Sequence, residues 1–272
     1  SPDRIVIGAG VGVLLNILAS LFEKDKTVSF PDKSFVQGIG IFQDNGFTVH
    51  TRDKNADIIY VSPSHMTRWG DVMKNKRRLE LVEYSFKNNS TVIEDDYEND
   101  FMYNVKPTPA LFTLGHGNVI YIGSFSAMLL PGIRISFMVL NKELAEIFNK
   151  NKYKFAQTAS KTEQIALCQY IRDGHINSQT RKIRRLYSNK TKNFYSILKN
   201  EFPNANISIS ENTLQIIMSV KFDKDIKVFE ENSISLFVEK YENGVITIVL
   251  SPSGIPSSKL LKAAKTLKKA IN

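Results

Sequence analysis

Short runs of apolar residues alternate with amphipathic segments through the first half of the chain. The runs predict strands at residues 4–7, 27–30, 47–50, 58–62, 91–94, 119–123 and 133–140. Apolar residues at helical spacing predict helices between them at 13–22, 34–45 and 77–88. Because strands that alternate with helices are typical of a mostly parallel, helix-covered sheet, we predict an α/β fold here.

The pattern changes after residue 140. Helical periodicity covers 142–171, interrupted in places, and 175–201, and strands follow near 207–210, 214–220, 235–237 and 245–250. A closing helix is predicted at 257–271, with one face lined by Leu260, Leu261, Ala264, Leu267 and Ile271. We therefore predict a large α/β domain at 1–150 and a smaller α+β domain at 151–272.

Composition narrows the class of protein. The chain has 272 residues, 42% of them hydrophobic, which is enough for a large core. A single cysteine, Cys168, excludes a disulfide framework and argues against a four-ligand metal site. We find no signal-peptide pattern and no apolar run near the roughly 20 residues that span a bilayer. We expect a cytoplasmic protein with no membrane contact.

The formal net charge of +9 raises the question of nucleic-acid binding. The densest basic stretch covers residues 181–199. Apolar residues recur through it at near-helical spacing, at Ile183, Leu186, Tyr187, Phe194, Ile197 and Leu198. This spacing favours the solvated face of a packed helix over a nucleic-acid surface.

Two segments place glycines or polar residues at the ends of predicted strands, where α/β folds bind ligands. RIVIGAGVGVLLNIL runs from a strand through Gly10 and Gly12 into a helix, whose first N–H groups can bind a phosphate. VIYIGSFSAMLLPGIRISFMVL supplies Ser124, Ser126 and Arg134, and two hydroxyls with a guanidinium also suit a phosphate. Taken alone, the first segment is more typical of a tight turn, and the serines of the second are ordinary in a loop after a strand.

A third segment, VIEDDYENDF, places Asp95 and Tyr97 just beyond a predicted strand. In isolation these acids are typical of a solvated, helix-capping turn. His65 and His116 belong to loops without a Ser/His/Asp order or metal-ligand spacing, so we predict neither as a catalytic residue.

The order of the segments carries a resemblance. IVIGAG…LL, YVSPSH…RRLELVEYS, VIEDDYENDF.Y, VIYIGSFS..LLPGIRISFMVL and QTASKTEQIAL resemble the C-terminal domain of MocR-type regulators of the GntR superfamily, most closely the branch that controls vitamin B6 synthesis. The resemblance covers nearly the whole chain. It implies a fold-type I aminotransferase fold, a homodimer, and DNA contact only through a winged-helix domain that precedes this part. We therefore expect a fragment of a longer regulator.

The resemblance also implies a site for pyridoxal 5'-phosphate. Asp95 falls where the family pairs an acid with the pyridinium nitrogen, and Tyr97 where it has a phenol near the ring hydroxyl. Phe35 falls at the position of a ring-stacking aromatic residue, usually tyrosine. The phosphate contacts fall on Gly10, Val11, Gly12, Ser124, Ser126 and Arg134.

Several positions depart from the family pattern. Ala127 stands where the family has the lysine that forms a Schiff base with the cofactor. Val11 replaces a hydroxyl residue, and Gln37 stands where related regulators can carry an effector-binding arginine. The segment between 49 and 58 is shorter than in the family. One change at residue 127 is compatible with a laboratory mutation, whereas several departures together indicate natural loss.

We therefore predict the effector-sensing and dimerisation domain of a bacterial transcription regulator, without aminotransferase activity. Pyridoxal 5'-phosphate is expected to bind non-covalently and weakly, if at all, and the effector is expected to be a vitamin B6 vitamer or an amino compound. Two alternatives remain: an aminotransferase dependent on pyridoxal phosphate and inactivated at Ala127, and a structural dimerisation module without a ligand.

Overall fold

The structure is a computed structural model that describes residues 1–66, 72–96, 108–126, 128–129, 132–210 and 214–272. The chain divides into two compact units. The first comprises Ser1–Asp100 and Lys106–Ile176, and the second comprises Phe101–Val105 and Asn177–Asn272. The predicted limit at residue 150 lies inside the first unit, and as a limit between independently folding domains it stays a prediction.

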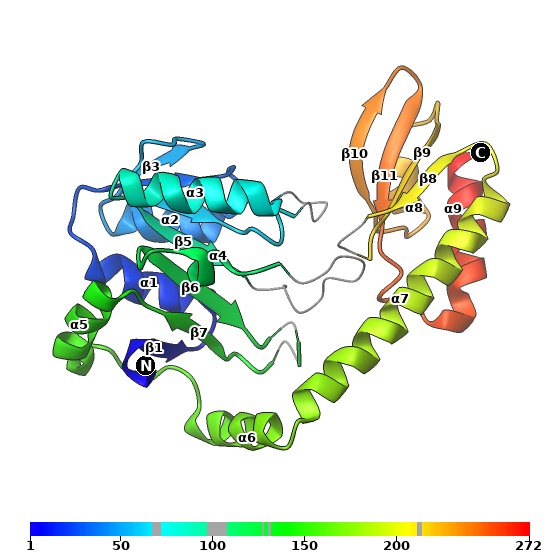
Figure 1. The fold of residues 1–272 in the computed structure, drawn as a ribbon. Coiled ribbons are helices and arrows are strands. Elements are labelled where there is room, and N and C mark those ends of the chain that lie inside the picture. The colour runs from blue at the N-terminus through cyan, green and yellow to red at the C-terminus, as the bar shows by residue number, and fades with distance from the viewer. Residues whose placement is uncertain (67–71, 97–107, 127, 130–131, 211–213) are drawn as a thin grey trace. The chain divides into compact units, whose positions relative to one another are not determined.

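In its described residues the first unit contains a seven-stranded sheet in the order β1-β7-β6-β5-β4-β2-β3 (Figure 1). The strands are β1 (Ile5–Gly8), β2 (Thr27–Phe30), β3 (Thr48–Thr51), β4 (Ile58–Val61), β5 (Thr91–Asp95), β6 (Val119–Ser124) and β7 (Ser136–Val139). Strands β2 to β6 pair in parallel, while β7 runs antiparallel to both β1 and β6. The predicted mostly parallel α/β sheet is confirmed.

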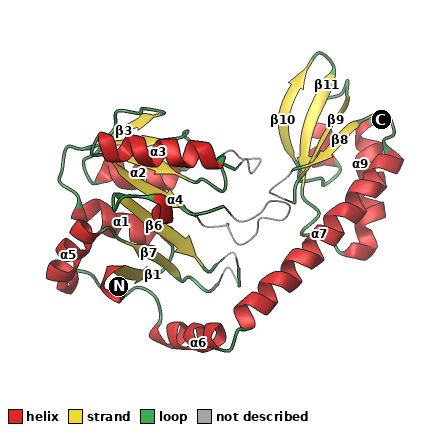
Figure 2. Cartoon of the chain, in the orientation of Figure 1, coloured by secondary structure: helices red, strands yellow, loops and turns green. Residues whose placement is uncertain are grey.

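Helices cover both faces of this sheet (Figure 2). Helices α1 (Val11–Leu21), α2 (Val36–Asp44) and α5 (Lys142–Asn151) contribute to one apolar core, in which Leu14, Leu18 and Ile93 are fully buried. On the other face, α3 (Asn75–Lys87) and α4 (Leu111–Leu114) pack on β5 and β6 through a second cluster. The runs between helices read as continuous apolar strands because the sheet is buried on both faces.

The single-turn helix η1 (Pro2–Arg4) precedes β1, and η3 (Lys152–Lys154) follows α5. The next helix, α6 (Lys161–Arg172), packs on the first unit: Leu167 is buried with Ile135 and Ala159. Helix α7 (His175–Glu201) then enters the second unit, and its bounds agree with the predicted helix.

The second unit holds a four-stranded antiparallel sheet in the order β10-β11-β9-β8, again within the described residues. Its elements are β8 (Asn206–Ile209), β9 (Ile216–Lys221), α8 (Lys227–Glu231), β10 (Phe237–Glu242), β11 (Val245–Leu250), η4 (Ser257–Lys259) and α9 (Leu260–Ile271). The end of α7 and one face of α9 pack on this sheet through Phe194, Leu198 and Leu267. An α+β arrangement was predicted for this part of the chain.

Two predicted helix faces need correction. In α9, Leu260, Ala264, Leu267 and Ile271 are buried, but Leu261 is 47% exposed because it lies one residue, about 100°, off that face. In α7 the packed face is confined to the C-terminal half. Leu186, in the N-terminal half, is 61% exposed, whereas Phe194 and Leu198 are buried.

Candidate functional site

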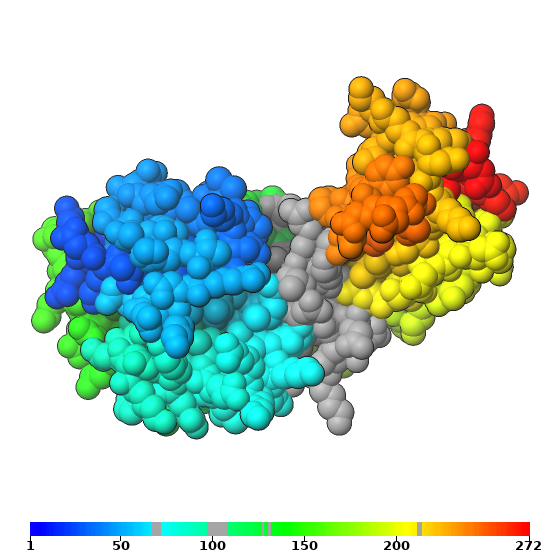
Figure 3. Space-filling model, turned by 90° about the horizontal axis from the view of Figure 1, so that it is seen from above, coloured from blue at the N-terminus to red at the C-terminus, as the bar shows by residue number. Residues whose placement is uncertain are grey.

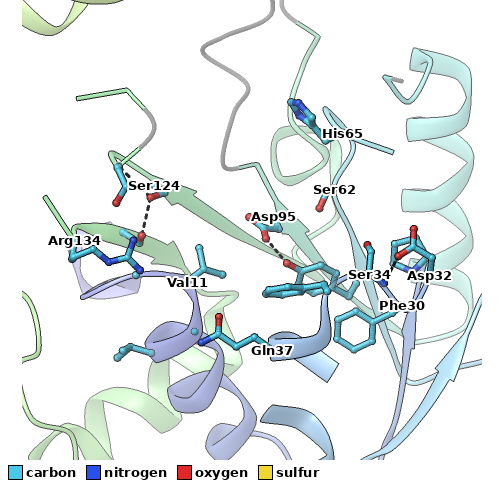
Figure 4. A pocket seen from close by; sticks show the side chains of 18 of the residues that line it. Val11, Phe30, Asp32, Ser34, Gln37, Ser62, His65, Asp95, Ser124 and Arg134 are labelled. Atoms are coloured by element: carbon cyan, nitrogen blue, oxygen red, sulfur yellow. Dashed lines mark hydrogen bonds between the residues drawn. The ribbon is translucent and has the colours of Figure 1, made fainter. Parts of the chain in front are cut away.

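A cavity of about 840 Å³ opens at the carboxyl ends of the central strands. Its lining comes from the turn between β1 and α1, the segment between β2 and α2, and the ends of β4, β5 and β6 (Figure 4). This is the edge at which α/β folds bind ligands, and the volume is within the usual range for small molecules.

The turn before α1 presents bare backbone to the cavity. Gly10 has φ +102° and ψ 164°, a conformation that essentially only glycine adopts. A Cβ at Gly10 would lie 2.5 Å from Nη2 of Arg134, and a Cβ at Gly12 would lie 2.7 Å from Nε2 of Gln37. Since the first N–H groups of a helix have no partner within it, Val11 and Gly12 offer donors between these two side chains.

Hydroxyl groups lie beside Arg134 at the same end of the cavity (Figure 4). Ser124 Oγ accepts hydrogen bonds from the Ser136 hydroxyl at 3.0 Å and from the Ser126 N–H at 3.3 Å. The Ser126 hydroxyl donates to the carbonyl of Ile133 at 2.8 Å. Its proton therefore stabilises the loop. Within the described part of the chain, Arg134 forms no ion pair, so its guanidinium can meet an anion.

Asp95 lies across the cavity from Arg134 (Figure 4). Its Oδ2 accepts a hydrogen bond from the Tyr60 hydroxyl. Its Oδ1 is buried and, among the described residues, has no hydrogen-bond partner. Burial raises the pKa of the Asp95 carboxyl to about 6, and repulsion from Asp96 adds to this, while the bond from Tyr60 opposes it. A ligand with a cationic N–H group would therefore supply the missing hydrogen-bond donor to Asp95 Oδ1.

The acids on either side of Asp95 point to the opposite face of the sheet, because side chains alternate along a strand. Glu94 accepts the N–H groups of Leu111 and Phe112, at 2.8 and 2.9 Å, and so holds the start of α4. Burial raises the pKa of Glu94 to about 7, although these N–H groups and Arg78, 3.7 Å away, oppose the rise. Asp96 accepts the hydroxyls of Ser64 and Tyr121. Both acids therefore have structural partners.

Aromatic rings form one wall of the cavity. Tyr60 stacks on Phe30 with ring centroids 4.8 Å apart, and Phe35 tilts against Tyr60 at 5.5 Å. The ring contacts fix the direction of the Tyr60 hydroxyl toward Asp95, and Phe35 lies in the lining where the sequence places an aromatic contact.

The sequence profile of the family "Aminotransferase class I and II" matches residues 1–257. The chain belongs to this family. Its fold is similar to the crystal structure of an archaeal alanine:glyoxylate aminotransferase, with a TM-score of 0.77 and 21% identity over 100% of this chain and 75% of that chain. At this identity the likeness concerns the fold alone, and it confirms the predicted fold-type I architecture.

In sequence, this aminotransferase domain is similar to part of several HTH-type transcriptional regulators. The HTH-type transcriptional regulator YhdI of Bacillus subtilis (strain 168) is 31% identical over 93% of this chain and 56% of YhdI. PdxR of Corynebacterium glutamicum, named an HTH-type pyridoxine biosynthesis transcriptional regulator, is 23% identical over 70% of this chain and 44% of PdxR. The chain spans about half the length of the curated relatives it matches. The resemblance to MocR-type regulators is confirmed; the lower identity with PdxR leaves the vitamin B6 branch a prediction.

The structure brings most predicted site residues of the aminotransferase domain into one cavity. These are Gly10, Val11, Gly12, Phe35, Asp95, Ser124, Ser126 and Arg134. Tyr97 and Ala127 lie outside the described residues. The cavity also holds Tyr60 and Ser136, which sequence reasoning missed because both belong to predicted strands that read as apolar core. That these residues bind the cofactor stays a prediction.

Within the described ranges, no group of three or more His, Cys, Asp or Glu residues is placed to hold a metal ion. Nor does any helix among the described residues combine the length and apolar character needed to cross a membrane.

Proposed function

We propose that this aminotransferase domain is the ligand-sensing domain of a DNA-binding regulator and does not catalyse transamination. One observation carries the proposal: the cavity contains an anion-binding turn with Arg134 and a buried acid, but its described lining residues include no amine. The family resemblance assigns Ala127 to the position of the reactive lysine, and none of the described residues that line the cavity is a lysine.

The residues present fit pyridoxal 5'-phosphate. The unpartnered Oδ1 of Asp95 would accept the ring N–H, which stabilises the protonated ring nitrogen. The backbone before α1, approached closely by Arg134 and bordered by Ser124, would hold the phosphate. When bound, the cofactor supplies an electron-withdrawing ring; binding and orienting it is what these side chains do. Without an amine at residue 127, no covalent bond to it forms and no lysine moves a proton.

The relatives support a regulatory role, since YhdI and PdxR are both named HTH-type transcriptional regulators. In this proposal the domain is a cytoplasmic homodimer, and DNA is contacted by a winged-helix domain elsewhere in the full-length protein. A ligand then acts by binding one arrangement of the domains more tightly than another, and the difference in affinity sets the size of the response.

Reduction with borohydride followed by intact-mass measurement tests the proposal. The unmodified protein, mixed with stoichiometric pyridoxal phosphate, is expected to bind it in calorimetry but to carry no covalent adduct after reduction. Ala127→Lys is expected to gain a visible absorbance band and one adduct. Ala127→Met, which has comparable length but no amine, is the matched control and is expected to gain neither.

Two results would contradict the proposal. An adduct on the unmodified protein, or protein-dependent formation of a keto acid from an amino acid, would support the enzyme alternative. Absence of binding heat together with a colourless Ala127→Lys variant would support the dimerisation module without a ligand.

A further inference from the structure

A second cavity, of about 660 Å³, is lined by residues 52–54 and by α3, and it borders the aromatic wall of the first cavity. We call it the crossover cavity, because it lies beside the connection from β3 to β4. In the sheet these two strands flank β2, so the connection must pass over β2. Residues 52–57 make this crossing with no helix, whereas parallel crossovers usually need about a dozen residues or more and contain one. Sheet surface that a crossover helix usually covers is left open.

Hydrogen bonds fix the short crossover on the face opposite Phe30. The N–H of Asp53 donates to Ser29 Oγ at 2.9 Å, and Asp57 accepts both the N–H and the hydroxyl of Thr27. The Tyr84 hydroxyl of α3 donates to Asn55 Oδ1 at 3.3 Å. These bonds fix the position of the crossover on β2 and join it to α3 at one end of the cavity. In the space-filling view, the blue segment around β3 lies on the same exposed face as α3, in cyan (Figure 3).

The walls of the crossover cavity are apolar. Ile59 and Met73 are buried, and Leu81 of α3 is half-buried. A volume of this size, with apolar side chains in its walls and three basic and three acidic residues in its lining, suits a small organic molecule that carries a charge.

Charge at the rim defines what kind of molecule fits. Arg77 pairs with Glu80 at 3.4 Å, but Arg52 and Lys54 form no ion pair within the described ranges. Arg52 uses Nε to bond the carbonyl of Pro31, which leaves its Nη groups for a ligand. The nearby acid Asp53 accepts the N–H of Asn55 within the loop. Asp32, also in the lining, accepts the N–H of Ser34.

We propose that the crossover cavity binds a small carboxylic acid with an apolar body, its carboxylate at Arg52 and Lys54 and its body between Ile59, Met73 and Leu81. The site is distinct from the cofactor cavity but adjoins it. Phe30, Pro31, Asp32, Tyr60 and Met66 line both cavities. Because Tyr60 donates to Asp95, an acid in the crossover cavity acts on the residue that orients Asp95. This coupling, unlike the binding itself, rests on the proposed function.

Methyl NMR of protein labelled at methionine measures the binding, with Met73 as the reporter and Met73→Leu to assign its signal. The probes are phenylacetate and isovalerate, each compared with its neutral amide. Both acids are expected to shift the Met73 signal saturably, with affinities about tenfold above those of the amides, because a hydrogen bond between ions is stronger than a neutral one. Arg52→Gln and Lys54→Gln should remove most of the difference between acid and amide. Lys76→Gln, on an exposed position of α3 outside the lining, should not.

Leu81→Trp, which fills the cavity, is expected to abolish the shift for acids and amides alike, with folding checked by circular dichroism. If that variant fails to fold, the Arg52 and Lys54 variants decide between the outcomes.

Equal affinity for acid and amide, or no saturable shift with either acid, would overturn the proposal. So would a Met73 signal that moves with protein concentration alone, since a second copy of the chain then covers the cavity. None of these results depends on pyridoxal phosphate, so failure here is distinguishable from failure of the proposed function. Coupling is read separately, as a change in pyridoxal phosphate affinity on saturation with phenylacetate.

Discussion

Replacing Asp95 with asparagine should change stability and ligand affinity in opposite directions. Asparagine keeps the size of the side chain and an oxygen that can accept the Tyr60 hydroxyl, but it cannot ionise. Asp95 is buried, with one oxygen unpartnered among the described residues, and burial raises its pKa from 3.8 to about 6. The ionised carboxylate therefore destabilises the folded, unliganded protein, and it is also the group that attracts a cationic ring nitrogen.

The size of both effects follows from the pKa. A shift from 3.8 to about 6 corresponds to about 3 kcal/mol, at 1.36 kcal/mol for each pH unit. Because the folded pKa lies above the unfolded one, the contribution is full below about pH 4 and is lost as pH rises through about 6. Near neutral pH, unliganded Asp95→Asn should be more stable by up to about 3 kcal/mol. Its affinity for pyridoxal phosphate should fall about 10- to 100-fold with the loss of a charge-assisted hydrogen bond.

Calorimetric unfolding at pH about 5 and about 7.5, with and without pyridoxal phosphate, measures both effects. Unliganded Asp95→Asn should lose less stability than the unmodified protein between these two pH values. Asp96→Asn is the matched control, since Asp96 is also buried but has two hydroxyl partners on the other face. It should not gain stability. The reasoning is refuted if Asp95→Asn destabilises the unliganded protein as Asp96→Asn does, or if its affinity for pyridoxal phosphate is unchanged.

Three further outcomes are expected. Arg134→Gln should lower the affinity for pyridoxal phosphate at least about tenfold but leave the affinity for pyridoxal unchanged. Arg77→Gln, at an exposed position, is the control and should change neither affinity. Equal losses of affinity for both ligands in titration calorimetry would contradict a role of Arg134 in binding the phosphate. Gly10→Ala, at φ +102°, should cost about 1–3 kcal/mol and also weaken pyridoxal phosphate by displacing Arg134. Its control Gly46→Ala, at φ +87° with nothing within 4 Å, should lower stability alone, and unchanged affinity in Gly10→Ala would refute the cradle. Sedimentation at micromolar concentration should find a dimer, and monomer alone would contradict the proposed assembly.

The sequence predicts the regular elements well where a single physical cause sets them. Strand β11 (Val245–Leu250) agrees with its predicted bounds, because six apolar or β-branched residues leave only a buried strand as a solution. Strand β10 was predicted to end at Phe237 but continues to Glu242. Its charged residues are largely exposed at the edge of the sheet, so hydrogen bonding rather than apolar patterning defines it. Short α8 (Lys227–Glu231) has too few residues for helical spacing to appear.

The candidate site shows a different limit. Glu94, Asp95 and Asp96 are three consecutive acids, and their residue types do not show which of them faces a ligand. The alternation of side chains along the strand decides that the middle one points to the cavity. The family resemblance selected Asp95, and the structure places it in the lining. Its partner Tyr60 lies 35 residues away in sequence, and nothing local in an apolar strand marks one aromatic residue as a hydrogen-bond donor. Pairing of β4 with β5 in parallel brings the two together. Only the fold supplies that information.

In the proposed function, an alanine at residue 127 in place of the family's lysine has a consequence for sensing that follows from the other contacts. An imine to a lysine would add a reversible covalent bond to the other contacts, and would so lower the free concentration at which the cavity fills. In the proposed function, the ligand is held by Arg134, by the backbone at Gly10 and Gly12, and by Asp95, and each charged contact contributes about 1.5–3 kcal/mol. Affinity of this kind leaves occupancy dependent on the free ligand, and only a ligand whose occupancy varies can shift a conformational equilibrium. In the proposed function, alanine at residue 127 thus both prevents transamination and raises the free ligand concentration at which the cavity fills.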